Sequence, residues 1–163
     1  MVRRTTIESR VVKDRDLIYL DHNASTPCDP RVVEAMLPFF TAVAANPASR
    51  NHRPGREALT ALEDAREVVA RCIGAGSPTE IVFTSGASEA NNLALAAAAE
   101  ALAPRRRHLL TQATEHPSVL EPLRRLAARG WELTVIGVCR DGRVRLDELA
   151  AALREDTALV SLM

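Results

Sequence analysis

The stretch that decides the fold is IVFTSGASEANN, residues 81–92, where a short apolar run breaks at Gly86 and passes directly into an alanine-rich helix. A glycine lets the backbone approach a bound group closely, and Ser88 adds a hydroxyl group. The first turn of a helix directs unpaired N–H groups and the positive end of its dipole to the same place. The stretch therefore predicts a corner that binds a phosphate. The structural alternative is a plain strand-to-helix turn, in which Ser88 caps the helix and Gly86 permits the bend.

Length and composition are those of a folded globular protein. The 163 residues are 47% hydrophobic and 26% charged, which is enough to bury one core. The 21 basic and 21 acidic residues cancel, so neither nucleic acid nor an anionic membrane surface is an expected partner. No apolar run is long enough to span a bilayer and no secretory signal pattern is present, so we expect a cytoplasmic protein. The three cysteines lack the spacing of a zinc site or a disulfide framework, and no metal is predicted.

Strands and helices alternate from residue 81 onward. The predicted strands are residues 81–84, 108–112, 132–138 and 158–163, and the predicted helices are residues 88–103, 118–129 and 147–154. This alternation predicts right-handed crossovers and an α/β fold, with a parallel sheet covered by helices on both faces. In such sheets the ligand binds beyond the carboxyl ends of the strands.

A histidine follows the predicted strand 108–112 at that end of the sheet. His116 closes the polar segment Thr114-Glu115-His116, where an imidazole could stack on a flat cofactor or move protons near neutral pH. The alternative is that His116 caps the helix that begins directly after it, and the residues alone leave both interpretations open. His108, which enters the strand, is predicted to be structural. Residues 18–20 are predicted to form a further short strand.

Four segments resemble, in the right order, successive signatures of the NifS/IscS-type cysteine desulfurases. They are YLDHNASTP (residues 19–27), NPASRNHRPG (46–55), EIVFTSGASEANN (80–92) and TEH (114–116). The resemblance covers residues 18–163 and leaves residues 1–17 as an N-terminal extension. It implies the class V aminotransferase group and the large domain of a type I pyridoxal 5'-phosphate (PLP) transferase. That domain is a three-layer αβα structure with a mainly parallel sheet, of which we expect this chain to carry an incomplete, N-terminal part.

The resemblance assigns the cofactor to the corner and to the histidine. The backbone of Gly86, Ala87 and Ser88, with the Ser88 hydroxyl, would hold the phosphate of PLP. His116 would stack on the pyridine ring and assist proton transfer, which makes it the expected catalytic residue.

The resemblance also implies a substrate pocket built from the first two segments. Asn23 and Ala24 would lie along it, and Asn46 and His52 belong to a loop that shapes it. Asn51 replaces a serine that is usual in the family at this loop.

The activity implied is conversion of L-cysteine to L-alanine, with the sulfur passed to a protein persulfide and onward to iron–sulfur cluster assembly. Expected partners are L-cysteine, a homodimer mate or complementary polypeptide, and a sulfur-acceptor or scaffold protein. The Schiff-base lysine of the family has no counterpart, since Lys13 is the only lysine and precedes the first motif. None of the three cysteines matches the mobile cysteine of the family.

We therefore expect a fragment that is inactive alone. In the family topology its strand 81–84 is separated from the other strands, which leaves strand edges open. The alternatives are a noncatalytic half-domain that binds a homologue or a sulfur carrier, and part of another class V enzyme such as a selenocysteine lyase.

Overall fold

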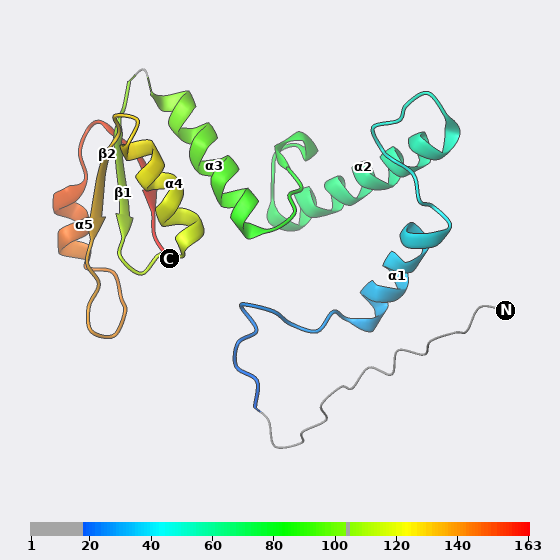
Figure 1. Cartoon of the computed structure of the whole chain (residues 1–163), viewed down its shortest axis with the longest axis horizontal. Helices are drawn as coiled ribbons and strands as arrows, with labels where there is room; N and C mark the ends of the chain where they lie inside the picture. The colour runs from blue at the N-terminus through cyan, green and yellow to red at the C-terminus, as the bar shows by residue number, and fades with distance from the viewer. Residues whose placement is uncertain (1–17, 104) are drawn as a thin grey trace. The chain divides into compact units, whose positions relative to one another are not determined.

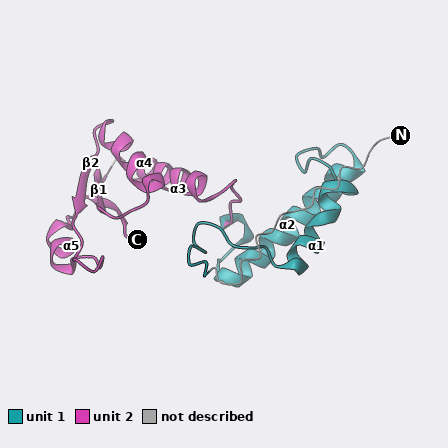
Figure 2. Ribbon diagram, turned by 60° about the horizontal axis from the view of Figure 1, so that its bottom comes forward, with its two compact units in different colours: residues 1–80 teal, residues 81–163 magenta. Residues whose placement is uncertain are grey.

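The computed structural model describes residues 18–103 and 105–163, so the predicted extension 1–17 and Lys13 lie outside the described residues. The chain divides into two compact units, Met1–Glu80 and Ile81–Met163 (Figure 2). The described part of the first unit is helical, and the second unit contains the sheet. A single domain over residues 18–163 stays a prediction. No helix in the described ranges is long and apolar enough to cross a membrane.

The first unit contains the helices α1 (Pro30–Thr41) and α2 (Arg53–Ile73) and the short 3-10 helix η1 (Pro78–Glu80). α2 ends at Gly74, whose φ of 71° is the left-handed conformation that favours glycine after a helix. The strand predicted at residues 18–20 is wrong, because a strand needs a paired neighbour and the described residues of this unit contain no strand.

The second unit is an α/β structure with a three-stranded parallel sheet of order β2-β1-β3. The chain runs through α3 (Ala87–Leu102), β1 (His108–Gln112), α4 (Pro117–Ala127), β2 (Glu132–Ile136), α5 (Leu146–Ala152) and β3 (Thr157–Ser161). The predicted alternation, the strand direction and the α/β class are confirmed. β2 and β3 each have a strand neighbour on one side only among the described residues.

Helices cover both faces of this sheet, as predicted. α3 and α4 lie on one side and α5 on the other (Figures 1 and 2). The core lies between β1 and the first pair of helices, where Leu95, Leu109, Val119 and Leu123 are buried together. α4 connects β1 to β2 across one face of the sheet, and α5 connects β2 to β3 across the other face. The second connection runs back past β1, so β3 pairs with the side of β1 that β2 leaves free.

The strand predicted at residues 81–84 is wrong as a strand. The segment enters α3 as irregular backbone, although Ile81 is buried. β1 already has a neighbour on each side, so this apolar run has no place beside it in the sheet. That the segment belongs to the same sheet, separated from these three strands, stays a prediction.

His108 is structural, as predicted. Its side chain is fully buried, Nδ1 lies 2.8 Å from Thr157 Oγ1 and Nε2 lies 2.9 Å from Thr134 Oγ1. The imidazole thus joins side chains of all three strands. Burial, followed by the positive charge of Arg154, lowers the pKa of His108 below its usual 6.5.

Candidate functional site

The first turn of α3 presents a set of free hydrogen-bond donors. The first backbone bond of the helix runs from Ala90 N to Gly86 O, at 3.1 Å. The N–H groups of Ala87, Ser88 and Glu89 therefore have no acceptor inside the helix, and no backbone acceptor elsewhere in the described chain. Within residues 18–103 and 105–163 the exposed Ser88 hydroxyl also has no hydrogen-bond partner. Three amides and one hydroxyl thus stand open at the positive end of the helix dipole.

Gly86 precedes this turn in a conformation that does not require glycine. Its φ of 162° and ψ of −179° are those of extended backbone. A Cβ atom added at Gly86 would meet no atom within 4 Å, whereas one added at Gly55 would lie 1.9 Å from the carbonyl oxygen of Ser49. The fold therefore explains the glycine at position 55 but not the one at position 86. The space beside Gly86 is open, and together with the free donors it fits a phosphate group.

The structural alternative for this corner does not match the geometry. The N-cap of α3 is Gly86, which makes no side-chain cap, and Ser88 lies inside the first turn. Neither a cap by Ser88 nor a bend that needs Gly86 is observed.

A carboxylate fixes the loop that leads into the corner. Glu89 Oε2 accepts hydrogen bonds from Ser85 N at 2.7 Å and from Ser85 Oγ at 2.6 Å. The bond from the Ser85 hydroxyl, and then the one from its amide, lower the pKa of the Glu89 carboxyl below its usual value. Glu89 had no predicted role, although a glutamate at the third position of a helix is a signal for this kind of return bond.

His116 is the N-cap of α4. Its Nδ1 accepts from Ser118 N at 3.1 Å and lies 2.8 Å from Ser118 Oγ. The capping interpretation is thus confirmed, while stacking and proton transfer stay predictions. The ring is exposed, and its Nε2 makes no hydrogen bond to any residue that the structure describes. The cap and a cofactor role are compatible, because the cap uses Nδ1 alone.

Asparagine side chains tie the start of α3 to α4. Asn91 Nδ2 donates to Ser118 Oγ at 2.9 Å, across 27 positions of sequence. This bond brings the helix that carries Ser88 against the residue that holds His116. The two predicted cofactor residues therefore lie at one end of the same unit. Asn91 lies in one of the four motif segments, whereas no motif contains Ser118 and neither side chain had a predicted role.

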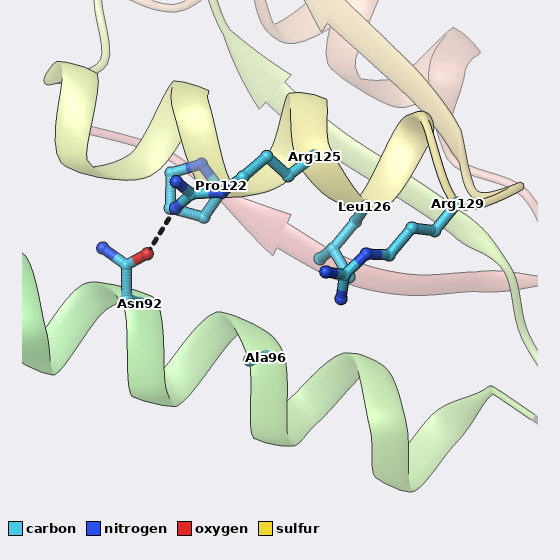
Figure 3. Close-up of a pocket in the computed structure, with 6 residues that line it drawn as sticks. All are labelled: Asn92, Ala96, Pro122, Arg125, Leu126 and Arg129. Carbon is cyan, nitrogen blue, oxygen red and sulfur yellow. Dashed lines mark hydrogen bonds between the residues drawn. The ribbon is translucent and has the colours of Figure 1, made fainter.

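Asn92 makes a second tie next to the first. Its Nδ2 donates to Ser88 O at 2.7 Å, and its Oδ1 accepts from Arg125 on α4 at 2.6 Å (Figure 3). A small cavity of about 90 Å³ lies along this contact. It is lined by Asn92, Ala96, Pro122, Arg125, Leu126 and Arg129. None of the predicted site residues lines it, so it is a feature of helix packing rather than the candidate site.

The carboxyl ends of β1 and β3 meet beside His116. Ser161 Oγ donates to Glu115 Oε1 at 2.8 Å, and Gln112 Nε2 donates to the carbonyl oxygen of Met163 at 3.3 Å. α/β proteins bind ligands beyond the carboxyl ends of their parallel strands, and these bonds lie at that end of β1 and β3. The prediction of a site at this edge agrees with the topology.

The predicted substrate residues belong to the other compact unit. Asn23 and Ala24 lie in an exposed turn, where Ala24 N donates to Asp21 O at 3.1 Å. Their place beside Ser88 and His116 stays a prediction.

The predicted loop of the first unit is firmly held. Asn46 Oδ1 accepts from Ala48 N at 2.9 Å, and His52 caps α2 by accepting from Gly55 N at 3.1 Å. Gly55 is buried against the loop at Ser49. The loop therefore presents Asn46 and His52 from a fixed backbone, as a pocket wall would require.

The chain is similar to known proteins in sequence and in fold. The profile of the family described as Aminotransferase class-V matches residues 18–163. The "Cysteine desulfurase IscS" of Methylococcus capsulatus is 49% identical over 146 residues, which are 90% of this chain and 36% of the relative. A solved "NIFS-like protein" is 41% identical with a TM-score of 0.81, and "SspA in complex with cysteine" is 37% identical with a TM-score of 0.78. Both alignments cover 90% of this chain, with 40% of the first structure and 42% of the second.

The curated relatives are much longer than the matched region, since this chain spans about 36% of their length. The match nevertheless runs without a break through both compact units, from the turn at Asn23 to the end of β3. The motifs, the parallel sheet and the glycine corner agree with it. By sequence and by fold, the chain belongs to the class V aminotransferases, a family of PLP-dependent enzymes.

Proposed function

We propose that this chain supplies the phosphate-binding part of the PLP site of a cysteine desulfurase. The observation that carries the proposal is the corner at Gly86, where an empty space adjoins four unused donors at the start of a helix. The phosphate of PLP is a dianion near neutral pH, and such a group is what a helix N-terminus attracts. PLP itself supplies an electron sink for the negative charge that develops on the substrate.

The residues of the corner act by binding and orientation. The amides of Ala87, Ser88 and Glu89 would donate to the phosphate oxygens, and the Ser88 hydroxyl would add a fourth bond. The Glu89 carboxylate stays engaged with Ser85, which limits its repulsion of the bound dianion. Anchoring the phosphate fixes the position of the attached ring.

His116 would lie against that ring and serve as the catalytic residue. Its Nδ1 is used by the cap of α4, so Nε2 is the atom that is free to hold or move a proton. Support for this role comes from the tie between Asn91 and Ser118, which holds the start of α4 close to the phosphate corner.

The proposed reaction converts L-cysteine and a protein thiol into L-alanine and a protein persulfide. The sulfur leaves the substrate carbon and forms an S–S bond with the thiolate, and that carbon gains a proton. Residues 18–163 contain no lysine, so the amine that binds PLP covalently is not among them. Asn23, Ala24, Asn46 and His52 are proposed to contact the substrate.

We extend the proposal to location and partners. The match to a cysteine desulfurase supports an enzyme of sulfur transfer. We propose that it acts in the cytoplasm and delivers sulfur to an acceptor or scaffold protein of iron–sulfur cluster assembly. The open sides of β2 and β3 support a complementary polypeptide or a second copy as the neighbour.

The test compares two ligands that differ only in the phosphate. Pyridoxamine phosphate lacks the aldehyde of PLP and so cannot react with amines, and pyridoxamine also lacks the phosphate. We expect the full chain to bind pyridoxamine phosphate but not pyridoxamine in equilibrium dialysis. Ser88→Ala should weaken that binding by about ten- to a hundredfold, because a hydrogen bond to a charged group contributes about 1.5–3 kcal/mol.

The stability of the variant serves as the control. The Ser88 hydroxyl has no partner in the described chain, so Ser88→Ala should change the free energy of unfolding by less than about 0.5 kcal/mol. Equal affinity for both ligands, or unchanged affinity of Ser88→Ala for pyridoxamine phosphate, would refute the proposal.

A further inference from the structure

We propose that Asn91 and Ser118 are positioning residues that fix the orientation and the tautomer of the His116 ring for the cofactor. The inference rests on the proposed function, because it concerns the ring that would face PLP. Neither residue carries a role in the sequence motifs, and both act through His116 rather than on a reacting atom.

The hydrogen bonds around Ser118 have one consistent direction. The Asn91 amide can only donate through Nδ2, so Ser118 Oγ accepts this bond at 2.9 Å. The backbone N–H of Ser118 donates to His116 Nδ1 at 3.1 Å, so this nitrogen is unprotonated and the Ser118 hydroxyl donates to it as well, at the shorter distance of 2.8 Å. Asn91 and the hydroxyl control only the shorter bond, so losing it should weaken the preference for an unprotonated Nδ1 without abolishing it. The order Asn91 to Ser118 to His116 therefore assigns the proton of the neutral ring to Nε2.

Two donors on one nitrogen also restrict how the ring turns. The backbone amide alone leaves the imidazole free to rotate about that bond. The Ser118 hydroxyl, itself held by Asn91, adds a second direction. Asn91 and Ser118 are half-buried while His116 is exposed, so the fold protects the donors that hold Nδ1 and leaves the ring accessible to solvent.

The tie made by Asn91 is separate from the one that Asn92 makes to Arg125. Arg125 donates to Asn92 Oδ1 at 2.6 Å and makes no hydrogen bond to the imidazole. Removing the Arg125 side chain therefore loosens the contact between α3 and α4 but leaves the hydrogen bonds from Asn91 to Ser118 and from Ser118 to His116 intact. Arg125→Ala is the matched control for a merely structural effect.

The experiment reads the tautomer of His116 directly, by ¹⁵N NMR of the imidazole nitrogens in the full chain near neutral pH. Wild type should show predominantly the Nε2–H form. Asn91→Asp replaces the donor by an acceptor of nearly the same shape, so the Ser118 hydroxyl should turn to the new carboxylate and the Nδ1–H population should rise. Ser118→Ala should give a smaller change in the same direction, and Ser118→Thr should restore the wild-type spectrum.

The same variants are then titrated with pyridoxamine phosphate and with inorganic phosphate. Asn91→Asp and Ser118→Ala should weaken pyridoxamine phosphate severalfold and leave inorganic phosphate nearly unchanged, because only the ring contact is altered. Arg125→Ala should change neither the tautomer nor the ratio of the two affinities.

Each failure has its own signature. A tautomer that is unchanged in Asn91→Asp, or changed equally in Arg125→Ala, overturns the positioning role while phosphate binding at Ser88 stands. The inference is also overturned if wild-type protein binds pyridoxamine phosphate no more tightly than inorganic phosphate, because the pyridine ring then contributes no affinity. Failure of wild type to bind pyridoxamine phosphate overturns the proposed function and the inference with it.

Discussion

Replacing Gly86 by alanine separates a requirement of the fold from a requirement of the ligand. Its backbone is extended and an added Cβ meets no protein atom within 4 Å, so the folded chain accepts alanine. Two small effects on stability oppose each other. Alanine lowers the entropy of the unfolded chain, which stabilises by about 0.4–1 kcal/mol. Alanine is also a poorer N-cap than glycine, which costs a similar amount. The free energy of unfolding should stay within about 1 kcal/mol of wild type.

The effect on binding should be much larger. The new methyl carbon lies about 1.5 Å from Cα, in the space proposed for a phosphate oxygen. The phosphate must then move away from the amides of Ala87 and Ser88 and lose at least one charge-assisted bond. We expect Gly86→Ala to bind pyridoxamine phosphate at least about tenfold more weakly, which corresponds to about 1.4 kcal/mol. Equilibrium dialysis measures this change, and urea denaturation measures stability.

A second glycine provides the control for this pair of measurements. An added Cβ at Gly142 also meets nothing within 4 Å, but its φ of 84° is left-handed. Gly142→Ala should therefore destabilise by about 1–2 kcal/mol and leave the affinity for pyridoxamine phosphate unchanged. Full affinity in Gly86→Ala would refute the reasoning. So would a loss of affinity matched by a loss of stability as large as that of the control.

Three further predictions concern the fold. Leu123→Ala removes a fully buried side chain of the α3, α4 and sheet core and should cost about 2–5 kcal/mol, measured by urea denaturation with the fluorescence of Trp131, which packs against that core. Gly55→Ala forces a methyl group against the Ser49 carbonyl and should destabilise the first unit by about 1–3 kcal/mol, seen as faster amide exchange in residues 46–55; unchanged exchange would contradict the close contact. His108 has a pKa below 6.5 in the folded chain, so the unfolded chain binds more protons and stability should fall as the pH drops below 6.5. His108→Gln should flatten that slope, and an equal slope in both proteins would show that another group titrates.

The repeating elements of the second unit could be predicted from the sequence because their signals are local. Apolar strands and helices of ordinary propensity each depend on neighbouring residues. The segment 81–84 could not be predicted in this way. Its composition favours a strand, but a strand exists only beside a partner, and pairing is decided by the whole sheet.

The candidate site likewise contains residues with a local signal and residues without one. Gly86, Ser88 and His116 could be found because each lies where a predicted strand gives way to a predicted helix. The bond between Asn91 and Ser118 could not, because it joins positions 27 residues apart that meet only after α3 packs on α4. Long-range side-chain bonds of this kind have no local signature.

The most direct test of the phosphate corner is a residue-resolved one. Amide ¹H–¹⁵N spectra of the full chain, recorded with pyridoxamine phosphate and with pyridoxamine, report which backbone N–H groups meet the phosphate. We predict that the amides of Ala87, Ser88 and Glu89 shift with the first ligand and stay in place with the second. Unmoved amides at the start of α3, with the largest shifts elsewhere in the chain, would contradict the account.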